Sequence, residues 1–215
     1  APGPEFRFAR LLKNETLDRE QRREYLNIIE EESLRLSDMA TNVLNLAKVE
    51  NQQILSNVSA FNLSEQVRNC FLQLEDKWSG KNLDADFDFG EVQICGNEEL
   101  LRQVWLNLLD NAVKFTPYGG EVRIKIEERE DSVCVSVINT GSTVAPENRE
   151  RIFRKFFQED RSHSTKGNGI GLAVVRQIVN LHGGSVWVES EQDCTTFKVL
   201  LPKTADERTG TLKNS

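Results

Sequence analysis

Positive charge is scarce in this sequence of 215 residues. Lysine and arginine together number 27 against 34 aspartates and glutamates, which leaves a formal net charge of −7 at pH 7. A chain with this balance has no overall positive field to hold a polyanion, so we do not expect it to bind nucleic acid. It also lacks any apolar run near the roughly 20 residues that cross a bilayer, so we expect membrane attachment only through segments upstream of this chain.

The residues that commonly bind zinc are few and scattered. The chain has two histidines, and its four cysteines (Cys70, Cys95, Cys134 and Cys194) form no Cys-x-x-Cys pair. Zinc sites need such ligands at short, regular spacings. We therefore expect no zinc site, and small buried thiols in a reducing compartment.

Glycine and proline are absent from residues 18–51, where apolar or small residues recur at alternating steps of three and four. This seam consists of Leu26, Ile29, Ser33, Leu36, Ala40, Val43 and Ala47. The pattern predicts a long helix that pairs with other helices, and the alternative is a long helix packed on its own domain. Residues 6–14 are interpreted as the end of a preceding amphipathic helix, which completes a hairpin. Residues 1–6 show no periodicity and are interpreted as a cloning remnant.

A second domain is predicted over residues 60–203, followed by a polar tail over 204–215. The pattern predicts helices over residues 61–77, 98–115, 146–157 and 171–181, and strands over 83–89, 92–95, 121–128, 132–139, 185–190 and 195–201. We therefore expect an α/β (α+β) two-layer sandwich, in which a mixed sheet of about five strands carries its helices on one face.

Two groups of residues in this domain suggest chemistry. Asn107, Asn111 and Lys114 share one face of the helix over 98–115, where carboxamide oxygens suit Mg²⁺ and an ammonium suits phosphate. Gly167, Gly169 and Gly171 lead into a helix N-terminus, whose free amides also suit phosphate. The alternatives are a solvated polar stripe and an ordinary loop before a capped helix.

Several ordered motifs then resemble the bacterial sensor histidine kinases. The segment from Asn107 to Phe115 resembles the N box, Asn139-Thr-Gly141 the first glycine box, and residues 152–157 the F box. Residues 167–172 resemble the second glycine box, residues 182–184 the turn that leads into the next strand, and residues 195–197 the last box. The hairpin is similar to the dimerisation and phosphoacceptor domain, so the resemblance covers residues 7–202.

The resemblance implies a site for ATP and Mg²⁺. Asn107, Asn111 and Lys114 would be catalytic, with Asn111 as the Mg²⁺ ligand. Gly167, Gly169 and Gly171 would anchor a mobile lid over the triphosphate. The full set of implied ATP-binding residues is Asn107, Asn111, Lys114, Phe115, Asn139, Gly141, Lys155, Gly167, Gly169, Ile170, Gly171, Leu172 and Thr196.

Departures from the family pattern affect the same site. Asn139 stands where the family has an aspartate that accepts the adenine amino proton, and Thr143 and Cys194 replace glycines. A neutral acceptor forms the weaker hydrogen bond, so we expect ATP binding that is retained but weaker. The family's phosphorylated histidine would lie upstream of Phe8, before this chain begins. We therefore expect residues 7–56 to be a dimerisation domain without its phosphoacceptor, and this chain to bind ATP without autophosphorylating.

The implied function is the kinase core of a two-component sensor, acting on a histidine and then on a response regulator. The full protein would be a homodimer through its hairpins, and this part would be the cytoplasmic portion of a membrane-anchored kinase. One alternative is a degenerate, ATP-independent interaction module of the same fold. Another is a serine kinase or a gyrase-type hydrolase, which the hairpin and Asn107 respectively oppose, because a hydrolase of that type carries a glutamate at the position of Asn107.

Overall fold

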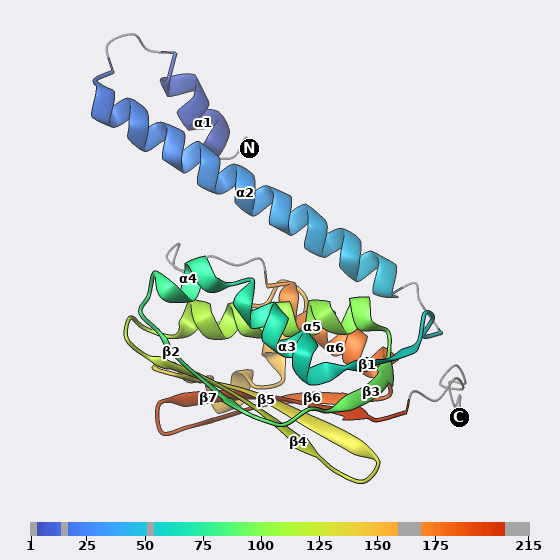
Figure 1. The fold of residues 1–215 in the computed structure, drawn as a ribbon. Helices are drawn as coiled ribbons and strands as arrows, with labels where there is room; N and C mark the ends of the chain where they lie inside the picture. Colours follow the sequence, from blue (N-terminus) through green and yellow to red (C-terminus); the bar gives the residue numbers. More distant parts are fainter. Residues whose placement is uncertain (1–3, 14–16, 51–53, 159–168, 205–215) are drawn as a thin grey trace.

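The computed structural model describes residues 4–13, 17–50, 54–158 and 169–204 (Figure 1). The chain begins with two helices, α1 (Pro4–Leu11) and α2 (Arg19–Glu50). The two helices lie side by side in opposite directions, and the rings of Phe8 and Tyr25 meet with centroids 5.2 Å apart. The hairpin is therefore present, but α1 begins at Pro4, inside the segment set aside as a remnant. Proline is tolerated in a first turn because its missing N–H has no partner there.

The two faces of α2 have different environments. Near its C-terminus, Leu46 and Val49 are buried at 6% and 1% exposure within the hydrophobic core, and α2 contacts α6 there. On the seam, Leu26, Leu36 and Val43 are 52%, 50% and 40% exposed. The helix thus uses one face to pack on the rest of this chain and leaves its heptad seam open.

The sheet has five strands in the order β2-β4-β5-β7-β6. Their bounds are β2 (Asp84–Asp88), β4 (Glu121–Glu128), β5 (Ser132–Thr140), β6 (Ser185–Glu191) and β7 (Cys194–Pro202). β2 pairs with β4 in parallel and the other pairs are antiparallel. A separate ribbon pairs β1 (Ser59–Asn62) with β3 (Gln93–Gly96). The predicted mixed sheet of about five strands is confirmed.

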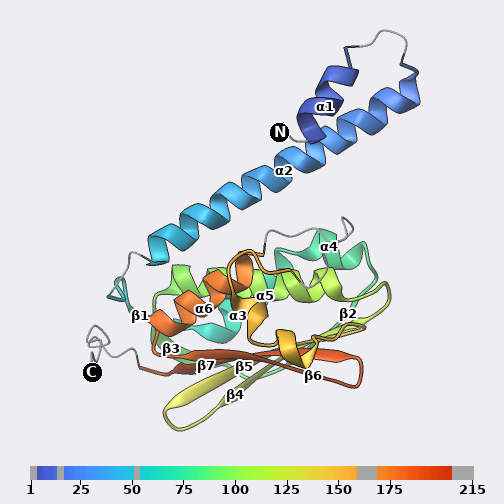
Figure 2. The same cartoon turned by 180° about the vertical axis from the view of Figure 1, so that it is seen from behind.

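Four helices form the second layer. They are α3 (Leu63–Leu72), α4 (Glu75–Ser79), α5 (Glu98–Phe115) and α6 (Gly171–Leu181), and all lie on one side of the sheet in both views (Figures 1 and 2). Seven residues of α5 are buried, including Trp105, whose indole donates to Gln66 Oε1 over 2.8 Å. The predicted two-layer sandwich is confirmed. In the described ranges, no helix is both long enough and apolar enough to cross a bilayer.

Two predicted helices are wrong in part. The segment over 61–77 begins as strand β1, because Phe61 pairs with Ile94 of β3 and is buried. Asn62 still caps α3 by accepting from the Glu65 N–H over 3.0 Å, but α3 ends at Leu72. The segment over 146–157 is two single turns, η1 (Pro146–Asn148) and η2 (Arg151–Phe153), and Phe156 at φ 61° lies outside helical geometry.

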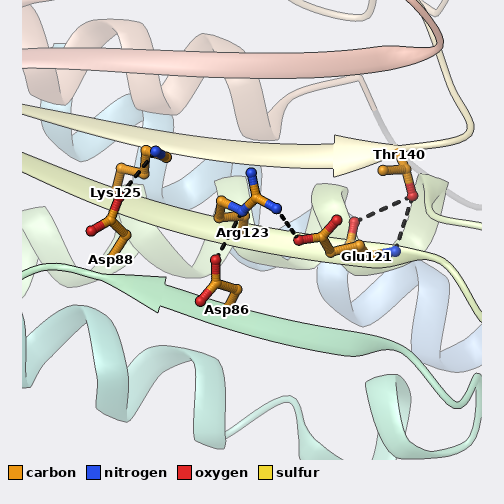
Figure 3. A network of polar contacts seen from close by, with 6 residues as sticks. All are labelled: Asp86, Asp88, Glu121, Arg123, Lys125 and Thr140. Carbon is orange, nitrogen blue, oxygen red and sulfur yellow. Dashed lines mark hydrogen bonds and ion pairs between the residues drawn. The ribbon is translucent and has the colours of Figure 1, made fainter.

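The edge of the sheet carries cross-strand ion pairs (Figure 3). Lys125 Nζ lies 3.0 Å from Asp88 and Arg123 Nε 2.9 Å from Asp86, joining β4 to the parallel edge strand β2. These groups are largely exposed, so each pair adds little to the stability of the sheet. At the far end of β4, the Glu121 N–H donates to Thr140 Oγ1 over 2.9 Å, which ties β4 to the last residue of β5.

Candidate functional site

The predicted polar face of α5 exists, and its first member faces another helix. Asn107 Nδ2 donates to the carbonyl of Gln103 over 2.8 Å, so its Oδ1 points away from its own helix. A β-carbon added to Gly171 would lie 2.6 Å from that Oδ1. The first residue of α6 therefore has to be glycine for Asn107 to keep this position. The structure thus brings together Asn107 and Gly171, 64 residues apart in the chain.

The N-terminus of α6 has free hydrogen-bonding capacity. Its cap residue, Ile170, provides no side-chain hydrogen bond to the first turn. The first amides of a helix lack partners within the helix and suit an anion. The side chain of Ile170 is fully buried, so only its backbone can face a ligand. Leu172 is partly buried against the core.

The glycine before this helix is also closely packed. Gly169 has φ +63°, and a β-carbon there would lie 2.7 Å from the Phe157 carbonyl oxygen. Its own carbonyl accepts from the Phe156 N–H over 2.7 Å. Lys155, in the turn after η2, is exposed. Gly167, the other glycine of this motif, lies outside the described residues.

Lys114 is partly buried at the end of α5. Its Nζ lies 4.8 Å from the centroid of the Phe115 ring. Burial lowers the pKa of Lys114 below the ordinary lysine value, the Asp110 carboxylate opposes this shift, and the Lys81 ammonium adds to it. Phe115 itself is 43% exposed, so part of the ring is accessible to a ligand.

No role was predicted for Lys81, although it forms hydrogen bonds at the C-terminal end of α5. Its Nζ donates to the carbonyls of Val113, Lys114 and Thr116 over 2.9, 2.7 and 2.8 Å. A cation among the last carbonyls of a helix is favourable. A lone lysine in a loop carries no spacing signal, so the sequence could not have revealed this role.

His182 joins the far ends of α5 and α6. Its Nδ1 lies 2.8 Å from the Ile178 carbonyl and its Nε2 accepts from the Asn97 N–H over 3.1 Å. Asn97 in turn caps α5 by accepting from the Leu100 N–H over 2.9 Å. Burial lowers the pKa of His182, with the Ile178 bond acting against the shift, which favours the neutral ring that this geometry requires. The pair of helices that carries Asn107 and Gly171 is thereby fixed.

At the sheet, Asn139 faces the helices and is 2% exposed. Its partner in register on β7 is Thr195, which is also buried. Asn139 Nδ2 donates to Ser142 Oγ over 2.8 Å, and Thr195 Oγ1 donates to the Ser142 carbonyl over 2.7 Å. Gly141 makes the turn between them at φ +78°, where a β-carbon would lie 2.3 Å from Pro117 Cδ.

The structure does not bring Thr196 to this cluster. Thr196 pairs in register with Ile138 and Glu189, and successive side chains of a strand point to opposite faces of a sheet. The residue of the last box beside Asn139 is Thr195. Ser142 was also missed, because the resemblance assigned no role to it.

The site therefore has two ends. The helix end consists of Asn107, Asn111, Lys114 and Gly171, and the strand end of Asn139, Gly141, Ser142 and Thr195. The helix end combines carboxamides, a cation and helix amides, a donor set that fits phosphate groups and a divalent cation. The strand end presents the buried neutral side chains of Asn139 and Thr195, which fit a flat heterocycle with few hydrogen-bonding atoms. A nucleoside triphosphate fits both.

Comparisons with known proteins agree with this chemistry. Residues 96–205 match the family described as histidine kinase-, DNA gyrase B- and HSP90-like ATPases. Sensor histidine kinase CusS of Escherichia coli (strain K12) is 34% identical over 174 residues, which cover 80% of this chain and 36% of the relative. The chain thus spans little more than a third of the length of this curated relative.

Two solved structures are similar over nearly the whole chain. Histidine kinase ThkA in complex with response regulator protein TrrA has a TM-score of 0.79 at 29% identity, covering 95% of this chain and 58% of that one. Full-length ShkA in complex with AMPPNP has a TM-score of 0.72 at 29% identity, covering 94% and 42%. On this evidence the chain belongs to the histidine kinase-, DNA gyrase B- and HSP90-like ATPases and, within them, to the bacterial sensor histidine kinases.

Proposed function

We propose that this chain is the part of a sensor kinase that holds Mg²⁺-ATP and presents its γ-phosphoryl group to a histidine, from which it passes to a response regulator. The observation that carries the proposal is the close approach of Gly171 to Asn107 Oδ1. It places the polar face of α5 at the N-terminus of α6, which makes one continuous surface for a phosphate chain.

Each end of the site has a distinct role. Asn107 and Lys114 would bind phosphate oxygens, the amides at the start of α6 would add further donors, and Phe115 would lie against the base. Asn111 would supply a neutral oxygen to Mg²⁺, which keeps much of its water and takes other ligands from phosphates. Asn139, supported by Ser142 and Thr195, would accept the exocyclic amino proton of adenine. Mg²⁺ held there would neutralise charge that develops on the phosphates.

The side chains of the helix end favour storage of ATP over its hydrolysis. A general base for water needs a titratable group, and the carboxamide of Asn107 has none near neutral pH. The chain's contribution is then to bind, orient and shield the phosphates until an imidazole nucleophile arrives.

Calorimetric titration with AMPPNP tests the proposal. We expect binding that requires Mg²⁺, is reduced by EDTA, and is weakened at least about tenfold by Asn111→Ala through loss of a metal ligand. Asn69→Ala, a change of the same type on an exposed position of α3, should bind like the unchanged chain. Absence of AMPPNP binding in every condition would instead support the degenerate interaction module, for which the replacements Asn139, Thr143 and Cys194 are the motivating residues.

We further propose that these 215 residues do not autophosphorylate. The chain has two histidines. Both ring nitrogens of His182 are engaged in hydrogen bonds within the fold, and His163 lies outside the described residues. Incubation with ATP labelled at the γ-phosphate should yield no acid-labile phosphoprotein, and its appearance would contradict this proposal. Steady release of labelled phosphate would revive the hydrolase alternative.

The hairpin over residues 7–56 is proposed as a dimerisation domain and residues 60–203 as the catalytic domain. The open seam of the hairpin (Leu26, Leu36 and Val43) supports pairing with a second hairpin, since such apolar stripes are normally covered. The similarity to ThkA, which was solved in complex with the response regulator protein TrrA, supports a response regulator as partner. Sedimentation of the unchanged chain and of Leu36→Glu would show whether the seam mediates dimerisation.

A further inference from the structure

Asn139 differs from an aspartate in the hydrogen bonds that its two terminal atoms can form. A carboxamide accepts hydrogen bonds at its oxygen and donates them at its nitrogen, whereas a carboxylate accepts at both atoms. Asn139 is 2% exposed and faces the helix layer from the end of β5. In such a buried place, the end of the amide that faces a ligand decides whether that ligand must donate or accept.

Two neighbours use the nitrogen end of this amide. Asn139 Nδ2 donates to Ser142 Oγ over 2.8 Å, and it lies 3.4 Å from the carbonyl oxygen of Thr140. Among the described residues no hydrogen bond is made to Asn139 Oδ1. The oxygen is thus the end left for a ligand. Ser142 makes the shorter of the two contacts that hold the nitrogen end of the amide.

Ser142 is itself held from several sides. Its carbonyl accepts from Thr195 Oγ1 over 2.7 Å, and the preceding Gly141 N–H donates to the Asp193 carbonyl over 2.8 Å. Two residues later, the Val144 N–H donates to Ser190 Oγ over 2.9 Å. The loop that carries the serine is therefore attached to β6 and to the β6–β7 turn, and the hydroxyl stays within reach of Asn139.

We propose that Ser142 is a positioning residue that sets the base specificity of this site. By taking the amino end of Asn139, it presents Oδ1 to the base, so that the site accepts a purine with an amino group at position 6 and rejects one with an oxygen there. The inference rests on the proposed function, in which Asn139 contacts the base. It goes further because it explains how a neutral amide can select a base that a carboxylate would select by its charge.

The test compares binding of ATP and inosine triphosphate, whose purine carries an oxygen at position 6, by calorimetry with Mg²⁺. For the unchanged chain we expect ATP to bind at least about tenfold more tightly, because an oxygen facing Oδ1 leaves two acceptors unpaired. In Ser142→Ala the amide is free to turn, and we expect this preference to fall about three- to tenfold. Ser142→Thr keeps the hydroxyl and should restore the preference. Ser136→Ala is the control, because Ser136 lies on the same strand as Asn139 but points to the other face of the sheet, so this change should leave the preference for ATP unchanged.

A nucleotide-free measurement separates this inference from the proposed function. The side-chain amide resonances of Asn139, assigned by their loss in Asn139→Asp, should shift in Ser142→Ala and stay near their original position in Ser142→Thr. An unchanged preference and unchanged resonances in Ser142→Ala would overturn the inference. Equal binding of both nucleotides by the unchanged chain would overturn it as well. If neither nucleotide binds the unchanged chain, the proposed function fails and the proposed specificity with it, and the amide resonances report only whether Ser142 orients Asn139.

Discussion

The helix end and the strand end of the candidate site are built in different ways. At the helix end, Asn107, Asn111 and Lys114 share a face because they follow each other at helical spacing within α5. At the strand end, Asn139 and Thr195 are 56 residues apart in the chain and meet because β5 pairs with β7 in one register. One end depends on local geometry and the other on long-range pairing.

This difference affects how easily a substitution disturbs each end of the site. A helix keeps its side chains in order as long as it remains folded, and α5 is capped by Asn97 and held at its end by Lys81. The strand end depends on a tight loop, in which Gly141 and Ser142 are each fixed by a residue from another segment. We therefore expect small changes to disturb the strand end more than the helix end.

The largest effect is expected at the turn of the strand end. Gly141→Ala places a β-carbon at φ +78° and 2.3 Å from Pro117 Cδ, so it adds steric overlap to backbone strain. Gly119→Ala is the matched control, with φ +73° and nothing within 4 Å of the added carbon. Strain alone amounts to about 1–2 kcal/mol, so we expect Gly141→Ala to lower the free energy of unfolding by about 3 kcal/mol and the control by about half of that. Urea denaturation of both variants measures the difference, and equal losses would mean that the proline can move aside.

The helix end should respond through affinity more than through stability. In Gly171→Ala the new carbon meets the end of the Asn107 side chain, which can rotate away. Alanine is also the better helix former by about 1 kcal/mol, so the folded state should be little affected. The displaced carboxamide no longer faces the start of α6, and we expect AMPPNP binding to weaken about 10- to 100-fold, the range for a lost hydrogen bond to a charged group.

Gly90→Ala is the control for that variant, because its added carbon meets nothing within 4 Å. Calorimetry gives the affinity, and thermal unfolding without nucleotide gives the stability. A Gly171→Ala chain that binds AMPPNP normally would show that Asn107 does not need its present position.

A third variant, His182→Gln, tests the contact between the end of α6 and the start of α5, and it leaves the polar face of α5 unchanged. The neutral ring of His182 joins α6 to the cap of α5. Because burial lowers its pKa in the folded state, the unfolded chain binds the extra proton first as the pH falls below about 6.5, the ordinary value for histidine. Stability is therefore complete above that pH and falls below it, by at most about 1.4 kcal/mol per pH unit for one proton.

Urea denaturation between pH 7 and pH 5 measures this loss. We expect His182→Gln to remove most of the pH dependence, because the variant has no group at this position that titrates in the range. His163→Gln alters the other histidine of the chain and should retain it. An unchanged pH dependence in His182→Gln would mean that other groups cause it.

The same contrast between local and long-range geometry explains what the sequence could predict. The helix over 98–115 and the grouping of Asn107, Asn111 and Lys114 follow from a period of 3.6 residues, and the structure confirms both. The five strands of the main sheet follow from alternation and turn residues. These features need only neighbours in sequence.

The differences between prediction and structure fall where distant segments decide the outcome. Phe61 lies in a strand rather than a helix because β3 pairs with it, and no local signal reports that partner. The choice of Thr196 over Thr195 depends on which face of β7 meets Asn139, so a shift of one residue changes the answer. Lys81 and Ser142 act through backbone and amide groups that only the folded chain brings near them.

The smallest effect is expected from a change at Asn139. Asn139→Asp replaces a neutral acceptor by a charged one at the strand end, without any change at the helix end. Hydrogen bonds to charged groups are about twice as strong as neutral ones, so AMPPNP should bind about 2- to 10-fold more tightly. The carboxylate must be buried at a position that is 2% exposed, so the nucleotide-free chain should become less stable.

Calorimetry and urea denaturation measure the two changes, and Asn69→Asp on the exposed face of α3 controls for the added charge. Weaker binding by Asn139→Asp would contradict the assignment of this residue to the base, because a stronger acceptor cannot weaken a bond that the ligand donates.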